Sequence, residues 1–246
     1  MKQYLFAFYL LFFTIGCAKQ NHLADVQTRT YRIEKASYPV DVAIAEAIEP
    51  YKVQLDATMN EVIGYNEAEM VKGKPSSSLT NWFTDALLAE TQKLVQDSLD
   101  FAIQNYGGIR LNSFAPGDIT IGKVYELMPF DNVMYIVELK GNLVKKLFDR
   151  LAQSGGWPIS NTVNFHIAYG EATNIFIKGM PLDTLKTYNV AIPDYVALGG
   201  DNMEMMKGAP MHNTNALVRD LLIQYIKDET SKGRNIIVNP SQRITE

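Results

Sequence analysis

The spacing of apolar residues changes repeatedly between two periods along the chain, and this change limits the fold more than any other feature. Apolar residues three and four positions apart, typical of helices, recur near 41–59, 79–95, 142–152 and 214–227. Short apolar runs typical of strands lie near 62–65, 99–104, 133–139, 163–168, 174–178 and 188–192, with a further strand near Ile236. Helices and strands are interleaved, so we predict one α/β domain with a mixed sheet flanked by helices.

Local signals refine two of these helices. Pro50 falls inside the first amphipathic pattern and is expected to interrupt or kink that helix. The serines at 76–78 precede the second pattern, and any of them can cap the helix. Its predicted buried face consists of Trp82, Phe83, Ala86, Leu87 and Leu94.

The N-terminus has the pattern of a secretory signal. Lys2 is followed by an almost unbroken apolar and aromatic run from Tyr4 to Ile15, too short to cross a bilayer core of about 30 Å. The segment ending in Gly16-Cys17 is similar to a bacterial lipobox, although Thr14 stands where that pattern prefers Leu or Val. We therefore expect a lipoprotein signal peptide at 1–16, lipidation of Cys17, a polar tether at 17–38 and the folded domain at 39–246. The alternative is an ordinary signal peptide with an unrelated cysteine.

Charge and cysteine content exclude several classes of function. The formal net charge is -4 and the pI about 5.5, whereas a protein that grips nucleic acid polymers needs an excess of lysine and arginine. Only one cysteine is present, so neither an intrachain disulfide nor a cysteine zinc site can form. We expect no nucleic acid partner.

The chain contains few residues that could perform hydrolysis. A two-metal phosphoesterase site needs several histidines and carboxylates together, and the three histidines, His22, His166 and His212, belong to no such cluster. No Gly-x-Ser-x-Gly elbow and no phosphate-binding Gly-x-x-x-x-Gly-Lys loop is present. We predict no catalytic residue, metal ligand or cofactor in this chain.

A glycine-rich loop is the first candidate for a binding site. The predicted strand at 99–104 leads directly into Asn105-Tyr106-Gly107-Gly108-Ile109-Arg110. Ligands of open α/β sheets collect where strands end and loops begin. The glycines free the loop from side-chain bulk, so Arg110 is well placed to meet a ligand.

Two further segments complete a pattern. Met128-Pro129-Phe130-Asp131-Asn132 follows the glycine-rich loop, and Asp194-Tyr195 with Gly199-Gly200-Asp201 lies further along the chain. Together with Gly117-Asp118-Ile119-Thr120, and in this order, these segments resemble the C-terminal, substrate-recognition domain of the 5'-nucleotidase family, which includes periplasmic UDP-sugar hydrolases. The resemblance covers roughly Val40 to the C-terminus.

The resemblance implies a role for each matching residue, and side-chain chemistry agrees. Arg110 carries a planar fork that fits a phosphate. Phe130 and Tyr195 would hold a base between their rings, and Asn132 and Asp201 would bind the base edge and the ribose. The complete set of expected nucleotide-binding residues is Asn105, Gly108, Arg110, Phe130, Asn132, Tyr195, Gly200 and Asp201. Solvated charge for Arg110 and a core position for the two aromatic residues remain the alternatives.

One segment departs from the family pattern. Where the family commonly has arginines ahead of a helix, this chain has Lys72 and Lys74. Lysine keeps the charge but loses bidentate geometry, so the phosphate side of the pocket is weakened or a different ligand is held.

The resemblance also implies a function. Family members join this domain to an N-terminal phosphoesterase domain with divalent metals, for which 1–38 leaves no room. We expect a nucleotide-recognition subunit, anchored by lipid in the cell envelope at the periplasmic or outer surface, that acts with a separate metallophosphoesterase chain and is inactive alone. The alternatives are a lipoprotein that binds nucleosides or nucleotides without an enzymatic role, and a scaffold whose pocket has lost its ligand.

Overall fold

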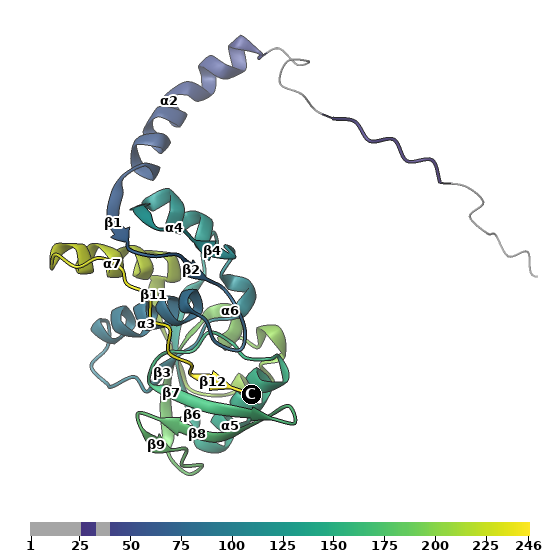
Figure 1. Ribbon diagram of the computed structural model, residues 1–246, viewed down its shortest axis with the longest axis vertical. Coiled ribbons are helices and arrows are strands. Elements are labelled where there is room, and N and C mark those ends of the chain that lie inside the picture. The colour runs from purple at the N-terminus through teal and green to yellow at the C-terminus, as the bar shows by residue number, and fades with distance from the viewer. Residues whose placement is uncertain (1–25, 33–39) are drawn as a thin grey trace, which may run out of the picture. The chain divides into compact units, whose positions relative to one another are not determined.

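The computed structural model describes residues 26–32 and 40–246 (Figure 1). The expected signal peptide and Cys17 lie outside these residues, as does most of the expected tether. The chain divides into two units, residues 1–48 and 49–246. Among the described residues, no helix has both the length and the apolar content that a membrane span requires.

Helix α2, Val42–Met59, begins in the first unit and ends in the second. Asp41 starts it, since its carboxylate accepts hydrogen bonds from the backbone N–H groups of Ala43 and Ile44 at 3.0 and 3.2 Å. The helix continues through Pro50, and none of its residues is buried. The sequence correctly predicted a helix here, and the helix is not interrupted at Pro50.

Two four-stranded sheets and two short ribbons form the β-structure of the described chain. The first sheet has the order β11 (Met211–Leu217), β6 (Val133–Lys140), β10 (Thr187–Pro193) and β3 (Phe101–Ala102). The second has the order β12 (Ile244–Thr245), β7 (Val163–Ala168), β8 (Glu171–Ile177) and β9 (Met180–Pro181). The ribbons pair β1 (Val62–Asn66) with β5 (Gly117–Thr120) and β2 (Met70–Val71) with β4 (Ser113–Phe114).

Strand directions bring three strand ends together at one end of the first sheet. β10 runs parallel to β3 and antiparallel to β6, with Pro193 opposite Met134. The end of β3, the start of β6 and the end of β10 therefore lie next to one another at the same end of the sheet. The sheet is mixed, as the sequence predicted.

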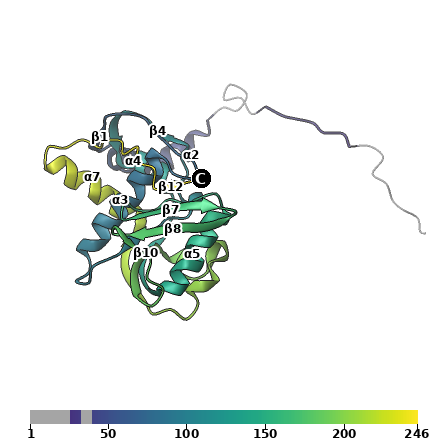
Figure 2. The same cartoon turned by 60° about the horizontal axis from the view of Figure 1, so that its bottom comes forward.

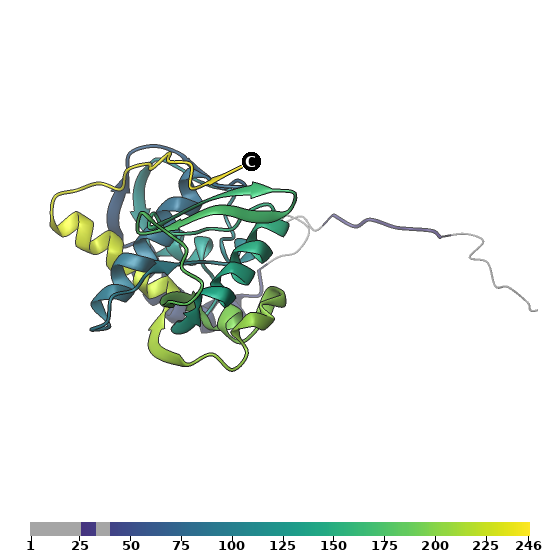
Figure 3. The same cartoon turned by 90° about the horizontal axis from the view of Figure 1, so that it is seen from below.

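A first apolar core lies among α3 (Ser78–Lys93), α4 (Ile121–Leu127) and α7 (Val218–Ser231). α3 and α7 lie side by side (Figure 3). α3 begins after Ser77, whose backbone N–H donates to Thr80 Oγ1 at 3.1 Å. Trp82, Phe83, Ala86 and Leu87 are buried, as predicted, because they occupy one face of this helix.

A second apolar core joins the two sheets to α5 (Gly141–Gln153), which packs against β8 (Figure 2). Its aromatic centre is a row of rings in which Phe148 lies 5.4 Å from both Phe101 and Phe165, measured between centroids. Phe148 comes from the helix and the other two rings from the two sheets, so this row holds helix and sheets together.

The last residues of the chain are fixed to α3. Arg243 is buried and its guanidinium donates to Ile159 O at 2.7 Å, to Asn81 O at 3.3 Å and to the carboxylate of Asp85. Asn81 Nδ2 in turn donates to Ser241 O at 2.7 Å. These bonds hold the segment in place, and β12 then pairs in parallel with β7.

Three local expectations are wrong. Residues 211–217 form strand β11, so the last helix begins at Val218 rather than near Thr214. Leu94 is 49% exposed, since α3 ends at Lys93. Ile236 makes only an isolated bridge with Asn66, and the final strand is β12.

Candidate functional site

Three loops surround one pocket at the edge where β3 and β10 end and β6 begins. The pocket has a volume of about 450 Å³. Its lining consists of Asn105, Gly107, Gly108, Arg110, Phe130, Asn132, Tyr195 and Asp201. Seven of the eight predicted site residues therefore lie together, although they come from segments far apart in the sequence. Gly200 is the one that is not part of the lining.

The first loop carries the cation of the pocket. A short 3-10 helix, η2 (Tyr106–Gly108), follows β3, and Arg110 lies just beyond it. Arg110 is exposed, and its Nη1 donates to Gly107 O at 3.3 Å. Its guanidinium carbon lies 5.4 Å from the centroid of the Phe130 ring. The guanidinium therefore retains donors for a ligand while it contacts one aromatic wall.

The packing of this loop requires a glycine at position 108, which also lines the pocket. A Cβ at this position would lie 2.0 Å from Gln104 Nε2 and 2.7 Å from Asn105 Oδ1. Gln104 is fully buried, and its Nε2 donates to Asn105 Oδ1 at 2.9 Å. This bond fixes the Asn105 amide so that its Nδ2 is directed to Asp201, at 3.3 Å.

The second loop presents an aromatic ring and an amide. Phe130 is 40% exposed, so its ring is not a core residue. Asn132 Nδ2 donates to Asp194 Oδ1 at 2.6 Å. Because a carboxylate only accepts hydrogen bonds, this contact leaves the Asn132 carbonyl oxygen as the acceptor available to a ligand.

The third loop joins Tyr195 to Asp201. Tyr195, in the short helix α6 (Asp194–Ala197), is 46% exposed, and its hydroxyl donates to Asp201 Oδ1 at 3.0 Å. This hydrogen bond raises the pKa of Tyr195 above its ordinary value. Gly200 lies behind the ring, where a Cβ would be 2.6 Å from Tyr195 Cζ. Its role is to let the ring pack on the backbone.

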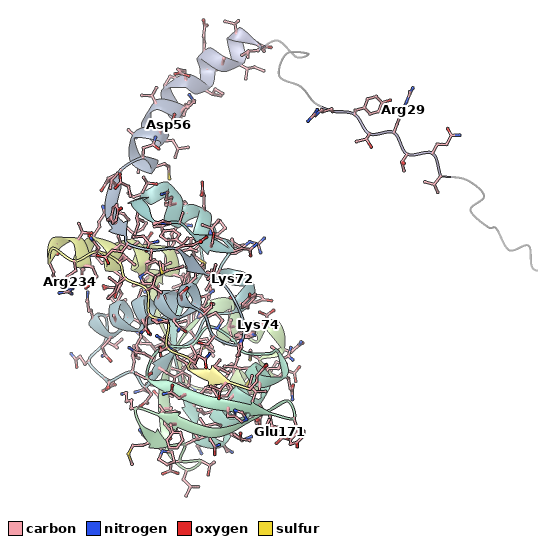
Figure 4. All side chains as sticks on the ribbon, viewed as in Figure 1. Arg29, Asp56, Lys72, Lys74, Glu171 and Arg234 are labelled. Carbon is pink, nitrogen blue, oxygen red and sulfur yellow. The ribbon has the colours of Figure 1, made fainter. Side chains whose placement is uncertain are left out.

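A group of cations flanks the pocket on the side of Arg110. Lys72 and Lys74 lie along the segment that leads into α3 (Figure 4). Their Nζ atoms lie 4.1 and 4.9 Å from the centroid of the Tyr106 ring. Lys72 Nζ donates to Ile109 O at 2.6 Å, and Lys74 Nζ donates to Ser154 O. Burial lowers the pKa of Lys72, and the charges of Arg110 and Lys74 lower it further.

These cations lack acidic partners within the described chain. Lys72, Lys74 and Arg110 form no ion pair there, whereas most other described lysines and arginines do, including Arg234 beyond the end of α7 (Figure 4). Mutual repulsion of three positive charges is unfavourable unless an anion joins them. The side of the pocket next to Arg110 is therefore suited to a negatively charged group.

Reasoning from the sequence missed several residues that hold the site. Arg219, on α7, donates to Asp131 Oδ1 at 2.9 Å and to Phe130 O at 3.3 Å, which fixes the second loop. Arg150, on α5, donates to Asp201 O through Nε and Nη2, both at 3.4 Å. Asp194 also accepts from Tyr195 N at 2.7 Å. Asp194 is adjacent to a predicted residue and could have been identified, but the two arginines carry no local signal.

The residues that the structure describes do not fit a metal centre. Within the described ranges, no group of three or more His, Cys, Asp or Glu side chains is placed to hold a metal ion. His166 Nδ1 lies 3.0 Å from Thr245 Oγ1, in the ladder between β7 and β12, and His212 lies on β11. Neither histidine lines the pocket.

Comparisons with known sequences and structures give one consistent result. The profile of a family described as "5'-nucleotidase, C-terminal domain" matches residues 57–208. Protein UshA of Salmonella pullorum is 31% identical over 184 residues, which are 73% of this chain and 32% of the relative. Protein UshA of Escherichia coli K12 is 31% identical over 181 residues, or 72% of this chain and 32% of the relative. The chain thus spans about a third of the length of these curated relatives.

Solved structures agree in fold. The 5'-nucleotidase precursor from Thermus thermophilus has a TM-score of 0.68 and 25% identity, covering 85% of this chain and 44% of that one. The NAD nucleotidase NadN of Haemophilus influenzae has a TM-score of 0.65 and 20% identity, covering 84% of this chain and 42% of that one. The NadN structure thus shares the fold of this chain, and the Thermus thermophilus structure shares both the fold and detectable sequence similarity.

Proposed function

Since the chain belongs to the 5'-nucleotidase C-terminal domain family, we propose that it recognises nucleotides for a metal-dependent phosphoesterase carried on a separate chain. The observation that supports this most is the pocket itself. Two exposed aromatic side chains, Phe130 and Tyr195, line the same cavity as an arginine with no acidic partner among the described residues. A planar base and a phosphate are the two parts of one molecule that these walls accept.

Different residues of the pocket contact different parts of the ligand. A base stacks on Phe130 and Tyr195, and its edge meets the carbonyl oxygen of Asn132. Asp201 accepts from sugar hydroxyls, and the phosphate meets Arg110, with Lys72 and Lys74 beside it. Stacking contributes about 1 to 3 kcal/mol per base, while a charge-assisted hydrogen bond contributes about 1.5 to 3 kcal/mol.

We propose that catalysis uses a group from outside this chain, since the described residues include no cluster that fits a metal centre. The chain's own residues bind and orient the nucleotide. Two-metal chemistry supplied by a phosphoesterase would polarise the phosphate and generate the nucleophile. The lipidated Cys17 that we propose would hold this recognition subunit at a membrane surface in the cell envelope.

Calorimetric titration with adenosine, adenosine monophosphate and adenine tests the binding step. The monophosphate should bind more tightly than adenosine, and adenosine more tightly than adenine, because each adds one recognised part. Failure of the chain to bind any of the three at millimolar concentration, with or without a metallophosphoesterase chain, would remove nucleotide recognition as its function.

Activity measurements test the partner. The purified chain with manganese, cobalt or zinc should not release phosphate from the monophosphate above background. A metallophosphoesterase chain from the same organism should do so faster in its presence, and less so with the Arg110→Ala variant. Nucleotide binding without any such stimulation would instead favour a binding lipoprotein with no enzymatic role.

The membrane anchor has its own test. Cys17→Ser should release the protein from the membrane fraction while the domain stays folded. A serine variant that still sediments with membranes would contradict lipidation at this residue.

A further inference from the structure

The carboxylate of Asp201 is held by two side chains that come from different loops. Tyr195 Oη donates to Oδ1 at 3.0 Å, and Asn105 Nδ2 donates to Oδ2 at 3.3 Å. Gln104 fixes the amide of Asn105 from behind, at 2.9 Å. A continuous series of hydrogen bonds therefore runs from the buried Gln104 through Asn105 and Asp201 to Tyr195.

The backbone of Asp201 needs such support. Its φ and ψ are 54° and 32°, in the left-handed region, and Asn202 follows with φ of 63°. Residues other than glycine adopt this conformation at a cost, and they keep it only where surrounding contacts hold them. Arg150 holds the Asp201 carbonyl, while Tyr195 and Asn105 hold its carboxylate.

The ring of Tyr195 is joined to the same turn. It packs so closely on Gly200 that an added Cβ would lie 2.6 Å from Tyr195 Cζ and 2.7 Å from Cε1. The ring of Tyr195, Gly200 and the carboxylate of Asp201 are therefore held together by direct contacts. The hydroxyl is the link between the ring that faces the pocket and the acid beside it.

We propose that the Tyr195 hydroxyl is a positioning group for Asp201, and that it couples recognition of the base to recognition of the sugar. The inference rests on the proposed function. Each carboxylate oxygen has a second lone pair, so Asp201 can accept from a ligand hydroxyl without losing Tyr195 or Asn105. The ligand class that this arrangement favours carries an aromatic base next to a vicinal diol.

Tyr195→Phe separates the two roles, since it keeps the ring and removes only the hydroxyl. Affinity for adenosine should fall about threefold to tenfold, the effect of one lost hydrogen bond. Affinity for adenine and for 2',3'-dideoxyadenosine should stay within about twofold of the wild type, because neither ligand carries the diol. Titration calorimetry with the three ligands measures this difference.

A double variant tests the coupling. Asp201→Asn alone should weaken adenosine binding, and adding Tyr195→Phe should weaken it no further, because the hydroxyl acts through the carboxylate. Tyr65→Phe is the matched control, since Tyr65 is 45% exposed against 46% for Tyr195 and lies on β1, outside the pocket. It should bind all three ligands like the wild type.

The outcomes that overturn the inference are distinct from those that overturn nucleotide binding. If Tyr195→Phe binds adenosine as the wild type does, or more tightly, the hydroxyl does not position Asp201. If adenine binding falls as much as adenosine binding, the loss reflects damaged stacking. If the wild type binds none of the three ligands, the proposed function fails, and this inference fails with it.

A measurement without ligand tests the hydrogen bond between Tyr195 and Asp201 directly. The hydrogen bond to Asp201 raises the pKa of Tyr195, so Asp201→Asn should return that pKa toward its ordinary value. Titration of the tyrosine ring signals by NMR follows the change. An unchanged Tyr195 titration would show that the two side chains are not coupled in solution.

Discussion

The guanidinium carbon of Arg110 lies 5.4 Å from the centroid of the Phe130 ring, so the cation and an aromatic wall of the pocket are already in contact. This contact lets a single ligand meet both at once. Arg110→Ala should therefore weaken binding of adenosine monophosphate about 10-fold to 100-fold, since charge-assisted hydrogen bonds are lost. Adenosine should lose far less. Calorimetric titration with both ligands measures the two losses of affinity. Lys123→Ala is the control for loss of a positive charge away from the pocket. Equal losses for the two ligands would contradict a phosphate role.

The Phe130 ring should contribute to every ligand that has a base. Phe130→Ala is expected to cost about 1 to 3 kcal/mol of binding free energy for adenine, adenosine and its monophosphate alike. Phe176 is 41% exposed against 40% for Phe130 and lies on β8, so Phe176→Ala is a matched control that should bind normally. A variant of Phe130 that retains wild-type affinity would leave the ring without a stacking role.

Binding of the phosphate should depend on pH through Lys72. Its pKa is lowered by burial, and also by the charges of Arg110 and Lys74, so Lys72 loses its proton at a lower pH than an ordinary lysine. The charged form is present below that pKa and is lost as pH rises through it. The affinity ratio of monophosphate to adenosine should therefore begin to fall at a lower pH than the ordinary lysine pKa of about 10.4 would give. Lys72→Arg should flatten this profile, because arginine stays charged. The same slope in both proteins would exclude Lys72 as its cause.

The buried ion pair of Arg243 and Asp85 should stabilise the fold far more than an exposed pair. Arg243→Met leaves the half-buried carboxylate of Asp85 without its partner and should cost about 3 to 5 kcal/mol of unfolding free energy. Arg234→Met removes an exposed arginine from its pair with Glu229 and should change stability only slightly. Urea denaturation of the two variants gives the comparison. Similar losses would mean that burial of Arg243 does not matter.

Much of the fold could be predicted because the spacing of apolar residues along a helix or strand indicates which of its side chains are buried. The buried face of α3 and the fully or half-buried strands β6 and β10 follow directly from their sequences. β11 could not be predicted, because it is an edge strand whose residues are mostly exposed and polar. An exposed strand has no apolar alternation, so nothing distinguishes it from the start of the helix that follows.

The pocket could be predicted as a set of residues but not as a network. Loops at strand ends carry Arg110, Phe130 and Tyr195, and the parallel pairing of β3 with β10 brings their ends together. The support from Arg219 and Arg150 depends on contacts across 88 and 51 positions of sequence. Neither arginine belongs to a motif, so only the packing of α5 and α7 reveals them.

The attachment of residues 239–245 to α3 has a consequence for how the protein comes to be made. Arg243 is translated 158 positions after Asp85, yet its guanidinium also bonds to Asn81 and Ile159, and β12 completes the sheet of β7. While this segment is still inside the ribosome, α3 and β7 lack those partners. The domain therefore reaches its native state only after synthesis has passed this point, and until then the nascent chain carries an unfinished surface at α3 and along the open edge of β7.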